Sequence, residues 1–229
     1  VNLQLCKADY RSDWDAVSMG YSAFDSLPKN FADFLIGHVS AKVASKNESN
    51  IWNGDKDNAG EFDGLVTLVS TDAALPAANE IAGSSALNAS STVIAELGTI
   101  VDQIPAELYG KEDLRIFISQ ATHKAYVRAM GALGYVDKFN NQAMGEDLLF
   151  DGIKLCVVHG LTGFQAMATT IDNIFFACGL QNDENVVKLI DMADVDGSEN
   201  VRLIMRMTGA VQSYNVEEIV TYGIANAAN

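Results

Sequence analysis

A long amphipathic stretch between residues 26 and 53, SLPKNFADFLIGHVSAKVASKNESNIWN, constrains the fold of this chain more than any other segment. Apolar side chains recur in it at steps of three and four residues, the spacing of one helix face, at Phe31, Phe34, Leu35, Val39 and Val43. Pro28 suits the first turn of a helix, where its missing N–H group would have no partner. The pattern predicts a helix of about 25 residues, or roughly 38 Å. Such a long helix must brace a large sheet or run along a subunit boundary.

The polar stretch that follows, from residue 47 to residue 66, is predicted to end this helix and turn the chain. Asn53 and Gly54 both tolerate the left-handed conformation of a helix C-cap. A calcium loop beginning at Asp55 would have Ala59 at its fifth position and Val66 at its twelfth, where oxygen ligands are required. The spacing therefore favours a turn, with weak cation binding as the alternative.

The other periodic segments predict strands and helices that do not alternate regularly. Residues 92–104 and 121–134 have helical spacing, and the hydroxyl of Thr92 is placed to cap the first of these helices. Residues 61–69 are predicted to turn into a short strand, and 77–92 are small and polar, as in a linker. Alternating or apolar runs predict strands at 1–10, 113–120, 152–161, 168–180 and 184–192. Residues 199–224 are predicted to contain one long strand, a turn near Gly209 and a final apolar segment. The predicted fold class is α+β.

The charge balance limits what the chain can bind. Lys and Arg total 15 and Asp and Glu total 30, so the formal net charge is −15. This argues against phosphate binding by bulk charge, because nucleic-acid surfaces need clustered basic residues. No apolar run is long enough to span a bilayer. The first residue is Val1 and no signal peptide follows, so we expect that the chain was processed or that part of it is missing.

Residues typical of catalysis are not arranged as an active site. His38, His123 and His159 lack the spacing of paired metal ligands, and no nucleophile elbow, phosphate-binding loop or dinucleotide-binding motif is present. The three cysteines are an odd number without a CxxC pair, which favours buried thiols over a disulfide framework. We therefore predict no catalytic residue, no cofactor and no metal ligand. Trp14 and Trp52 are predicted to anchor packing or a subunit interface.

The order of four segments resembles a known family. The stretch LPKNFADFLIGHVSAKVASKNESNIWNGD with GEFDGLV looks like a spine helix and its exit, and KEDLRIFISQATHKAYVRAM looks like a strand and helix that open an axial domain. IDNIFFACGLQNDENVVKLIDM is similar to a recurring strand, acidic turn and strand, and VRLIMRMTGAVQSYNVEEIVTYG resembles closing strands. Together they resemble the major capsid protein of tailed bacteriophages, which has the Hong Kong 97-like fold.

The resemblance implies a domain organisation. An α+β capsid fold has a peripheral domain, with a long spine helix and elongated strands, and an axial domain, with a central sheet flanked by helices. Residues 1–78 would form the peripheral domain, 79–91 a linker, 92–198 the axial domain and 199–229 the strands that return to the peripheral domain. Members usually have an N-terminal arm and an extended loop, and neither is visible upstream of Val1, so no crosslinking residue is carried over.

The resemblance also implies a function. The chain would be a structural protein, not an enzyme, that assembles with itself into hexamers and pentamers of an icosahedral shell around double-stranded DNA. It would assemble in the host cytoplasm, reside in the virion and have no membrane. Partners would be portal, scaffold or decoration proteins, and DNA would be enclosed without sequence-specific binding. Residues expected in packing or subunit contacts are Trp52, Phe31, Phe34 and Trp14.

Two other functions compete with this one. An encapsulin-type nanocompartment shell shares the fold and carries an enzyme as cargo. A cytosolic α/β enzyme using carboxylates would instead be a monomer or a small oligomer with a concave pocket.

Overall fold

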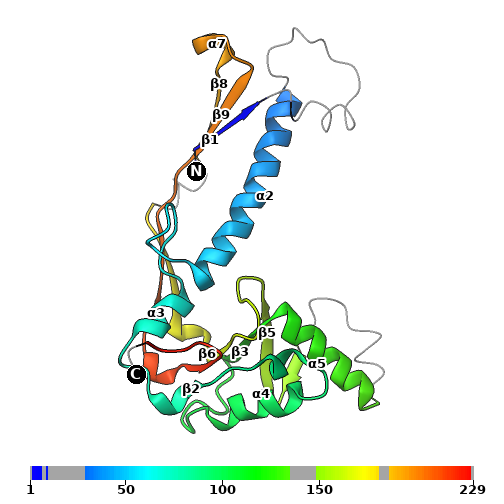
Figure 1. Ribbon diagram of the computed structural model, residues 1–229. Helices are drawn as coiled ribbons and strands as arrows, with labels where there is room; N and C mark the ends of the chain where they lie inside the picture. Colours follow the sequence, from blue (N-terminus) through cyan, green and yellow to red (C-terminus); the bar gives the residue numbers. More distant parts are fainter. Residues whose placement is uncertain (1, 7–8, 10–28, 135–147, 181–185, 228–229) are drawn as a thin grey trace. The chain divides into compact units, whose positions relative to one another are not determined.

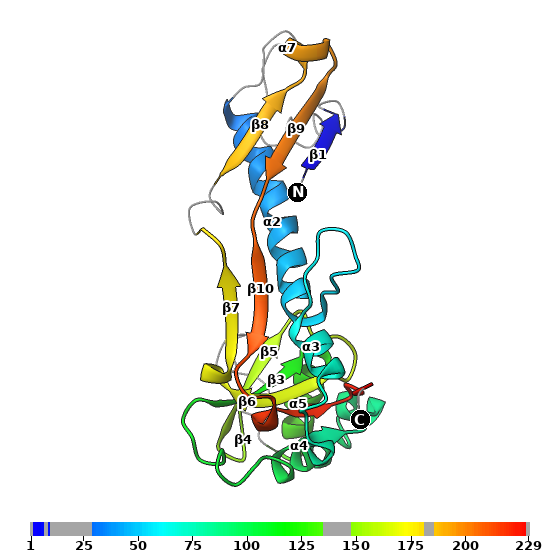
Figure 2. The same cartoon turned by 90° about the vertical axis from the view of Figure 1, so that its left-hand side faces the viewer.

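The computed structural model describes residues 2–6, 9, 29–134, 148–180 and 186–227, which form two compact units (Figures 1 and 2). Unit 1 consists of Val1–Asn47 with Cys178–Gly209, and unit 2 of Glu48–Ala177 with Ala210–Asn229. The longest helix is α2 (Lys29–Asn53), as the apolar spacing predicts. No helix in the described part of the chain is both long and apolar enough to cross a membrane.

Unit 2 is built on a mixed sheet of six strands in the order β2-β11-β6-β3-β5-β4. Its members are β2 (Glu80–Ile81), β3 (Leu114–Ser119), β4 (Leu148–Phe150), β5 (Ile153–Val158), β6 (Ala166–Thr170) and β11 (Val220–Tyr222). The central strand β3 pairs in parallel with β5 and antiparallel with β6. β11 pairs in parallel with β2 and antiparallel with β6, so it joins segments far apart in the sequence.

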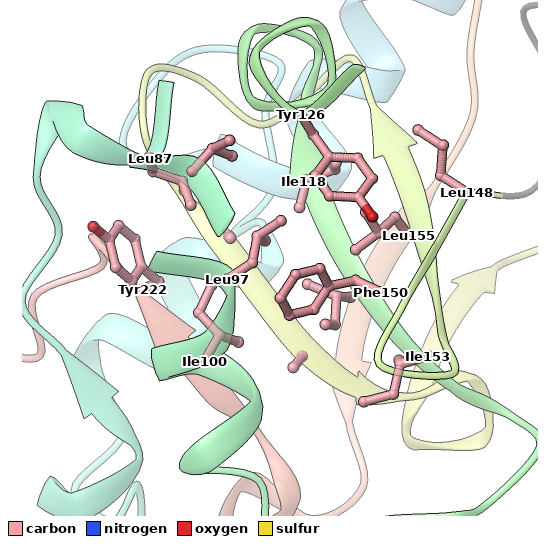
Figure 3. Close-up of a cluster of buried hydrophobic side chains, with 14 of the residues drawn as sticks. Leu87, Leu97, Ile100, Ile118, Tyr126, Leu148, Phe150, Ile153, Leu155 and Tyr222 are labelled. Carbon is pink, nitrogen blue, oxygen red and sulfur yellow. The ribbon is translucent and has the colours of Figure 1, made fainter. Parts of the chain in front are cut away.

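One face of this sheet is covered by the helices α4 (Val93–Asp102) and α5 (Gln120–Ala132). Leu97 and Ile100 of α4 pack in one cluster with Ile118 of β3 (Figure 3). Ile116 belongs to the same cluster, because alternate residues of a strand point to the same face. The α5 side of this cluster contains an edge-to-face contact between the rings of Tyr126 and Phe150, whose centroids are 6.0 Å apart.

The opposite face of the sheet is covered by α3 (Leu65–Thr71) and by the last turn of α2. Leu65 and Val69 of α3 pack in one cluster with Trp52 and with Met167 of β6. The strand predicted for residues 61–69 is therefore wrong. Its β-branched residues favour a strand locally, but helical spacing lets Leu65 and Val69 lie together on the sheet, and burial outweighs propensity.

Residues 79–91, predicted as a linker, lie inside unit 2. They contain β2 and the 3₁₀ helix η2 (Ser85–Asn88), and Leu87 is fully buried in the cluster beside α4. A second 3₁₀ helix, η1 (Ala77–Asn79), precedes them. The predicted cap at Thr92 is wrong, because its hydroxyl donates to the carbonyl of Ala86 at 2.7 Å instead of capping α4.

Unit 1 contains a three-stranded antiparallel sheet in the order β1-β9-β8, drawn in blue and orange in Figure 2. Its strands are β1 (Asn2–Cys6), β8 (Val187–Asp191) and β9 (Asn200–Met205), and α7 (Ala193–Asp196) lies between the last two in the chain. Val201 and Leu203 of β9 and Leu35 and Val39 of α2 are all buried. The sheet and the first part of the long helix therefore both supply apolar core to unit 1.

A two-stranded ribbon links the last segments of the chain. It pairs β7 (Ile174–Cys178) with β10 (Gly209–Ser213), and the 3₁₀ helices η3 (Ile171–Asn173) and η5 (Val216–Glu218) lie next to it in sequence. The long strand predicted after residue 199 is β9, and β10 begins at Gly209, where a turn was predicted; the two strands belong to different sheets. Helices and a mixed sheet confirm the predicted α+β class.

Candidate assembly surfaces

The aromatic residues predicted to anchor packing or contacts lie in different surroundings. Trp52 is only 6% exposed, and its ring lies 5.2 Å from that of Phe117, measured between centroids. Phe34 is half-buried and stacks on His38 with a centroid distance of 6.4 Å. Phe31 lies on α2, and Trp14 lies outside the described residues. Trp52 thus packs within its own subunit, whereas a subunit contact by any of the four stays a prediction.

The polar loop after α2 is held by the hydrogen bonds of turns. The amide of Asn58 donates to the carbonyl of Asp55 at 3.0 Å, and that of Glu61 donates to the carbonyl of Asn58 at 3.2 Å. Lys56 donates to Asp63 twice, from its backbone N to Oδ1 at 3.0 Å and from Nζ to Oδ2 at 3.2 Å. Both hydrogen bonds lower the pKa of the Asp63 carboxyl, and the bond from the backbone N–H has the larger effect. The Asp63 carboxylate in turn raises the pKa of Lys56.

The end of α2 differs from the predicted left-handed cap. Gly54 is not among the glycines with positive φ, and its amide donates to the carbonyl of Asn50 at 3.0 Å. A Cβ at this position would collide with the carbonyl of Phe62, so glycine is needed for close approach of two backbones. The Asn53 side chain donates to the carbonyl of Gly160, which ties the end of the helix to the loop after β5.

Titratable and metal-binding side chains do not converge on a reactive centre in the described part of the chain. His38 and His159 are exposed, and burial lowers the pKa of His123. No group of three or more His, Cys, Asp or Glu residues there could hold a metal ion. The described cysteines form no disulfide, but the prediction that all are buried is wrong, because Cys178 is exposed and Cys6 and Cys156 are half-buried.

Exposed aromatic side chains gather on the β7–β10 ribbon, where the sequence pattern indicated only a strand. Phe175 is 51% exposed, Phe176 is half-exposed, and Tyr214, just after β10, is 85% exposed. The ring of Phe176 lies 6.4 Å from that of Phe62, so Phe175 points to the opposite side of the ribbon. Two consecutive Phe residues on a strand are the signal that was missed, since a two-stranded ribbon cannot bury both of its faces.

A shallow hollow of about 510 Å³ lies between the loop after α4 and the β4–β5 turn. Lys111, Arg115 and Lys154 line it together with Glu112 and Asp151. The guanidinium of Arg115 donates to the backbone carbonyl of Leu114 at 2.8 Å. The charges around this hollow are mixed and give it no preference for a cation or an anion.

Comparison by sequence finds no relative: no protein-family model matches the chain, and no curated protein matches it. Comparison by structure does find similar chains. One, from the procapsid of satellite phage P4 including size determination (Sid) protein, has a TM-score of 0.60 at 7% identity, with 98% of this chain and 70% of that chain covered. The capsid of cyanophage P-SCSP1u gives a TM-score of 0.53 at 12% identity and coverages of 99% and 72%. A chain from Gordonia phage Cozz gives 0.52 at 13% identity and coverages of 97% and 68%.

These likenesses extend over nearly the whole chain, although sequence identity is very low. They include both compact units, the long helix and the mixed sheet. The chain therefore has the Hong Kong 97-like fold of tailed-phage capsid proteins.

Proposed function

We propose that this chain is the major capsid protein of a tailed bacteriophage. Copies of it assemble into the hexamers and pentamers of an icosahedral shell that encloses double-stranded DNA in the virion. The observation that carries the proposal is the likeness in fold, over 98–99% of the chain, to chains from a phage procapsid and a phage capsid structure. Its role is structural, and its main partner is a further copy of itself. Portal, scaffold or decoration proteins are additional partners in this proposal.

The peripheral and axial roles belong to the same proposal. The boundaries of the two compact units support a peripheral role for residues 29–47 and 199–209 and an axial role for residues 92–177. The strand β11 is hydrogen-bonded within the six-stranded sheet, which supports giving residues 220–222 the axial role in this proposal. In this proposal the segment 79–91 also has the axial role, because it lies within unit 2.

The exposed ribbon supports an assembling subunit. An isolated two-stranded ribbon is marginal in water, and aromatic side chains are enriched in interfaces. Phe175 and Tyr214 together would provide anchors for a neighbouring subunit. The acidic net charge of −15 also suits a container, because a wall with few basic groups does not grip the DNA that it encloses.

Electron microscopy of the full chain tests this function. We expect negatively stained particles of uniform diameter with hexagonal facets, and genome-length DNA inside particles purified from their native source. A small discrete oligomer would contradict the proposal, and a folded enzyme as cargo would favour a nanocompartment.

Substitution of the ribbon tests the proposed contact. Phe175→Ser should reduce particle yield while the subunit keeps its secondary structure. Leu133→Ser, at an apolar residue of similar exposure beyond α5, is the matched control and should assemble normally. Equal particle yields from both variants would show that β7 does not take part in a subunit interface.

A further inference from the structure

One face of the sheet in unit 1 combines basic and aliphatic side chains. In the β8–β9 register Lys188 lies opposite Ile204, and Ile190 lies opposite Arg202. Residues directly opposite each other in an antiparallel pair share a face, and so do alternate residues of each strand. Val186 and Arg206 extend this face, since both line a shallow hollow of about 330 Å³ together with Lys188 and Ile204. We name these six residues the basic face.

The basic face is open in the described part of the chain. Val186 is 49% exposed and Ile190 is 39% exposed, although both are aliphatic. Lys188 and Arg206 are exposed and make no salt bridge with any described residue. Arg202 donates weakly from Nη2 to the side-chain oxygen of Gln4 at 3.5 Å, and its Nε is buried without an acceptor among the described residues.

The described strand residues of this face include no carboxylate, which distinguishes the face within an acidic chain. Of the described strand residues, β1 contributes Asn2, Gln4 and Cys6, which lie opposite alternate residues of β9. Asp191 lies opposite Val201 and so belongs to the other face. Three of the chain's 15 basic residues thus lie together on a face to which no described strand residue contributes a carboxylate. The face is therefore locally basic, although the formal net charge of the chain is −15.

The side chains between the cations indicate what kind of surface would bind here. A phosphate backbone needs basic groups and, for single strands, aromatic stacking partners. This face instead places Val186, Ile190 and Ile204 between its cations, which suits a protein surface with carboxylates around an apolar contact. A copy of this chain has an excess of 15 carboxylates, so it is an electrostatically complementary partner.

We propose that the basic face binds an acidic surface of a second copy of this chain. The inference rests on the proposed function, because it names one contact by which the subunits of the shell recognise one another. Net charges of −15 repel at long range, and the basic face supplies a local attraction that selects one orientation.

A charge-reversal experiment on the full chain tests this contact. Lys188→Glu with Arg206→Glu reverses two charges of the basic face. Lys42→Glu with Arg128→Glu is the matched control, because it also reverses one exposed Lys and one exposed Arg, in α2 and α5. Each pair makes the net charge more negative by the same amount. Assembly is followed by light scattering and sedimentation, and circular dichroism checks that each variant is folded.

We expect the basic-face variant to need at least about tenfold more subunit to form particles, a factor that corresponds to losing a single charge-assisted contact. The control should assemble within about twofold of the wild type. Added salt should narrow the difference in threshold between the wild type and the basic-face variant, because it screens the local attraction that only the wild type has, whereas the long-range repulsion is screened in both.

Other outcomes would overturn the inference. If both variants have an equally raised threshold, only the net charge of the subunit matters. If both have the threshold of the wild type, the basic face is not used in assembly. Salt-sensitive binding of duplex DNA by the wild-type subunit, lost in the basic-face variant while assembly is normal, would assign the face to nucleic acid. A wild type that forms no particles would overturn the proposed function instead. Sedimentation equilibrium then tests the face: salt-sensitive self-association that the variant lacks supports it, and a monomer at every salt concentration refutes it.

Discussion

Trp52 is the side chain whose removal should damage the subunit most directly. It is buried beside Phe117 in the cluster between the end of α2, α3 and the six-stranded sheet. Trp52→Ala should lower the free energy of unfolding by about 3–5 kcal/mol, because it removes buried apolar surface and leaves a cavity. Urea denaturation of the unassembled subunit measures this. Trp52→Phe keeps an aromatic ring there and should cost less, and a loss below about 1 kcal/mol for Trp52→Ala would contradict the packing role.

Asp63 should make the loop after α2 sensitive to acid. The backbone N–H and the ammonium of Lys56 hold the pKa of the Asp63 carboxyl below its usual range. Because the folded-state pKa is depressed, the stabilisation is present above the ordinary pKa of aspartate and is lost as pH falls through the lowered value. Carboxyl NMR should show Asp63 titrating below the ordinary pKa of an aspartate.

A variant of Lys56 separates the two causes of that lowered pKa. Lys56→Met removes the ammonium but leaves the backbone N–H, so the pKa of Asp63 should rise only part of the way to its usual value. Complete return to that value would show that the backbone hydrogen bond contributes nothing.

The sequence predicted the turns of the loop after α2 but not the role of Gly54 or the exposure of Phe175. Failed ligand positions at Ala59 and Val66 were enough to favour turns over a calcium loop, and the hydrogen bonds of the loop are those of turns. The reason for Gly54 could not be predicted, because the carbonyl of Phe62 that excludes a Cβ is brought there by the turn itself. Exposure of Phe175 depends on which strand pairs with β7, and that pairing is not local information.

Two glycines in different elements should respond to alanine in opposite ways. Gly98 lies in α4, where a Cβ would meet nothing within 4 Å, so Gly98→Ala should stabilise the subunit by about 0.5–1 kcal/mol through helix propensity. Gly83 follows β2, and a Cβ there would collide with the backbone of Gly223. Gly83→Ala should therefore destabilise the β2–β11 pairing, and thermal unfolding of the two variants measures both signs. A stabilised Gly83→Ala variant would show that the two backbones can separate cheaply.

The long helices were predicted correctly from the sequence, whereas a short helix was not. α2 and α5 have enough turns for the three- and four-residue spacing to be clear, whereas α3 has seven residues and three of them are buried. Its apolar residues fit a short strand equally well, and only packing on the sheet decides between the two. The segment 79–91 is small and polar in composition, yet Leu87 is fully buried, and no local pattern announces that.

The charge of the whole subunit predicts a response of the assembled shell to divalent cations. Neighbouring subunits with a net charge of −15 repel one another, and Mg²⁺ at millimolar concentration would bridge or screen their carboxylates. Particles should therefore melt at a higher temperature with Mg²⁺ and at a lower one after chelation. The unassembled subunit should respond much less, since no cluster of metal ligands is found in its described part. Equal shifts for particles and subunits would place the cation effect within the subunit.

The order of strands in unit 2 also has a consequence for protein synthesis. β11 lies between β2 and β6, yet it leaves the ribosome about 50 residues after β6 and about 140 after β2. At about 5–20 residues per second, β6 waits several seconds with one edge unpaired. The nascent chain can complete β3, β5 and β6 early, but its sheet closes only when residue 222 has emerged. The sheet of unit 2 therefore cannot be completed while residues 220–222 are still inside the ribosome.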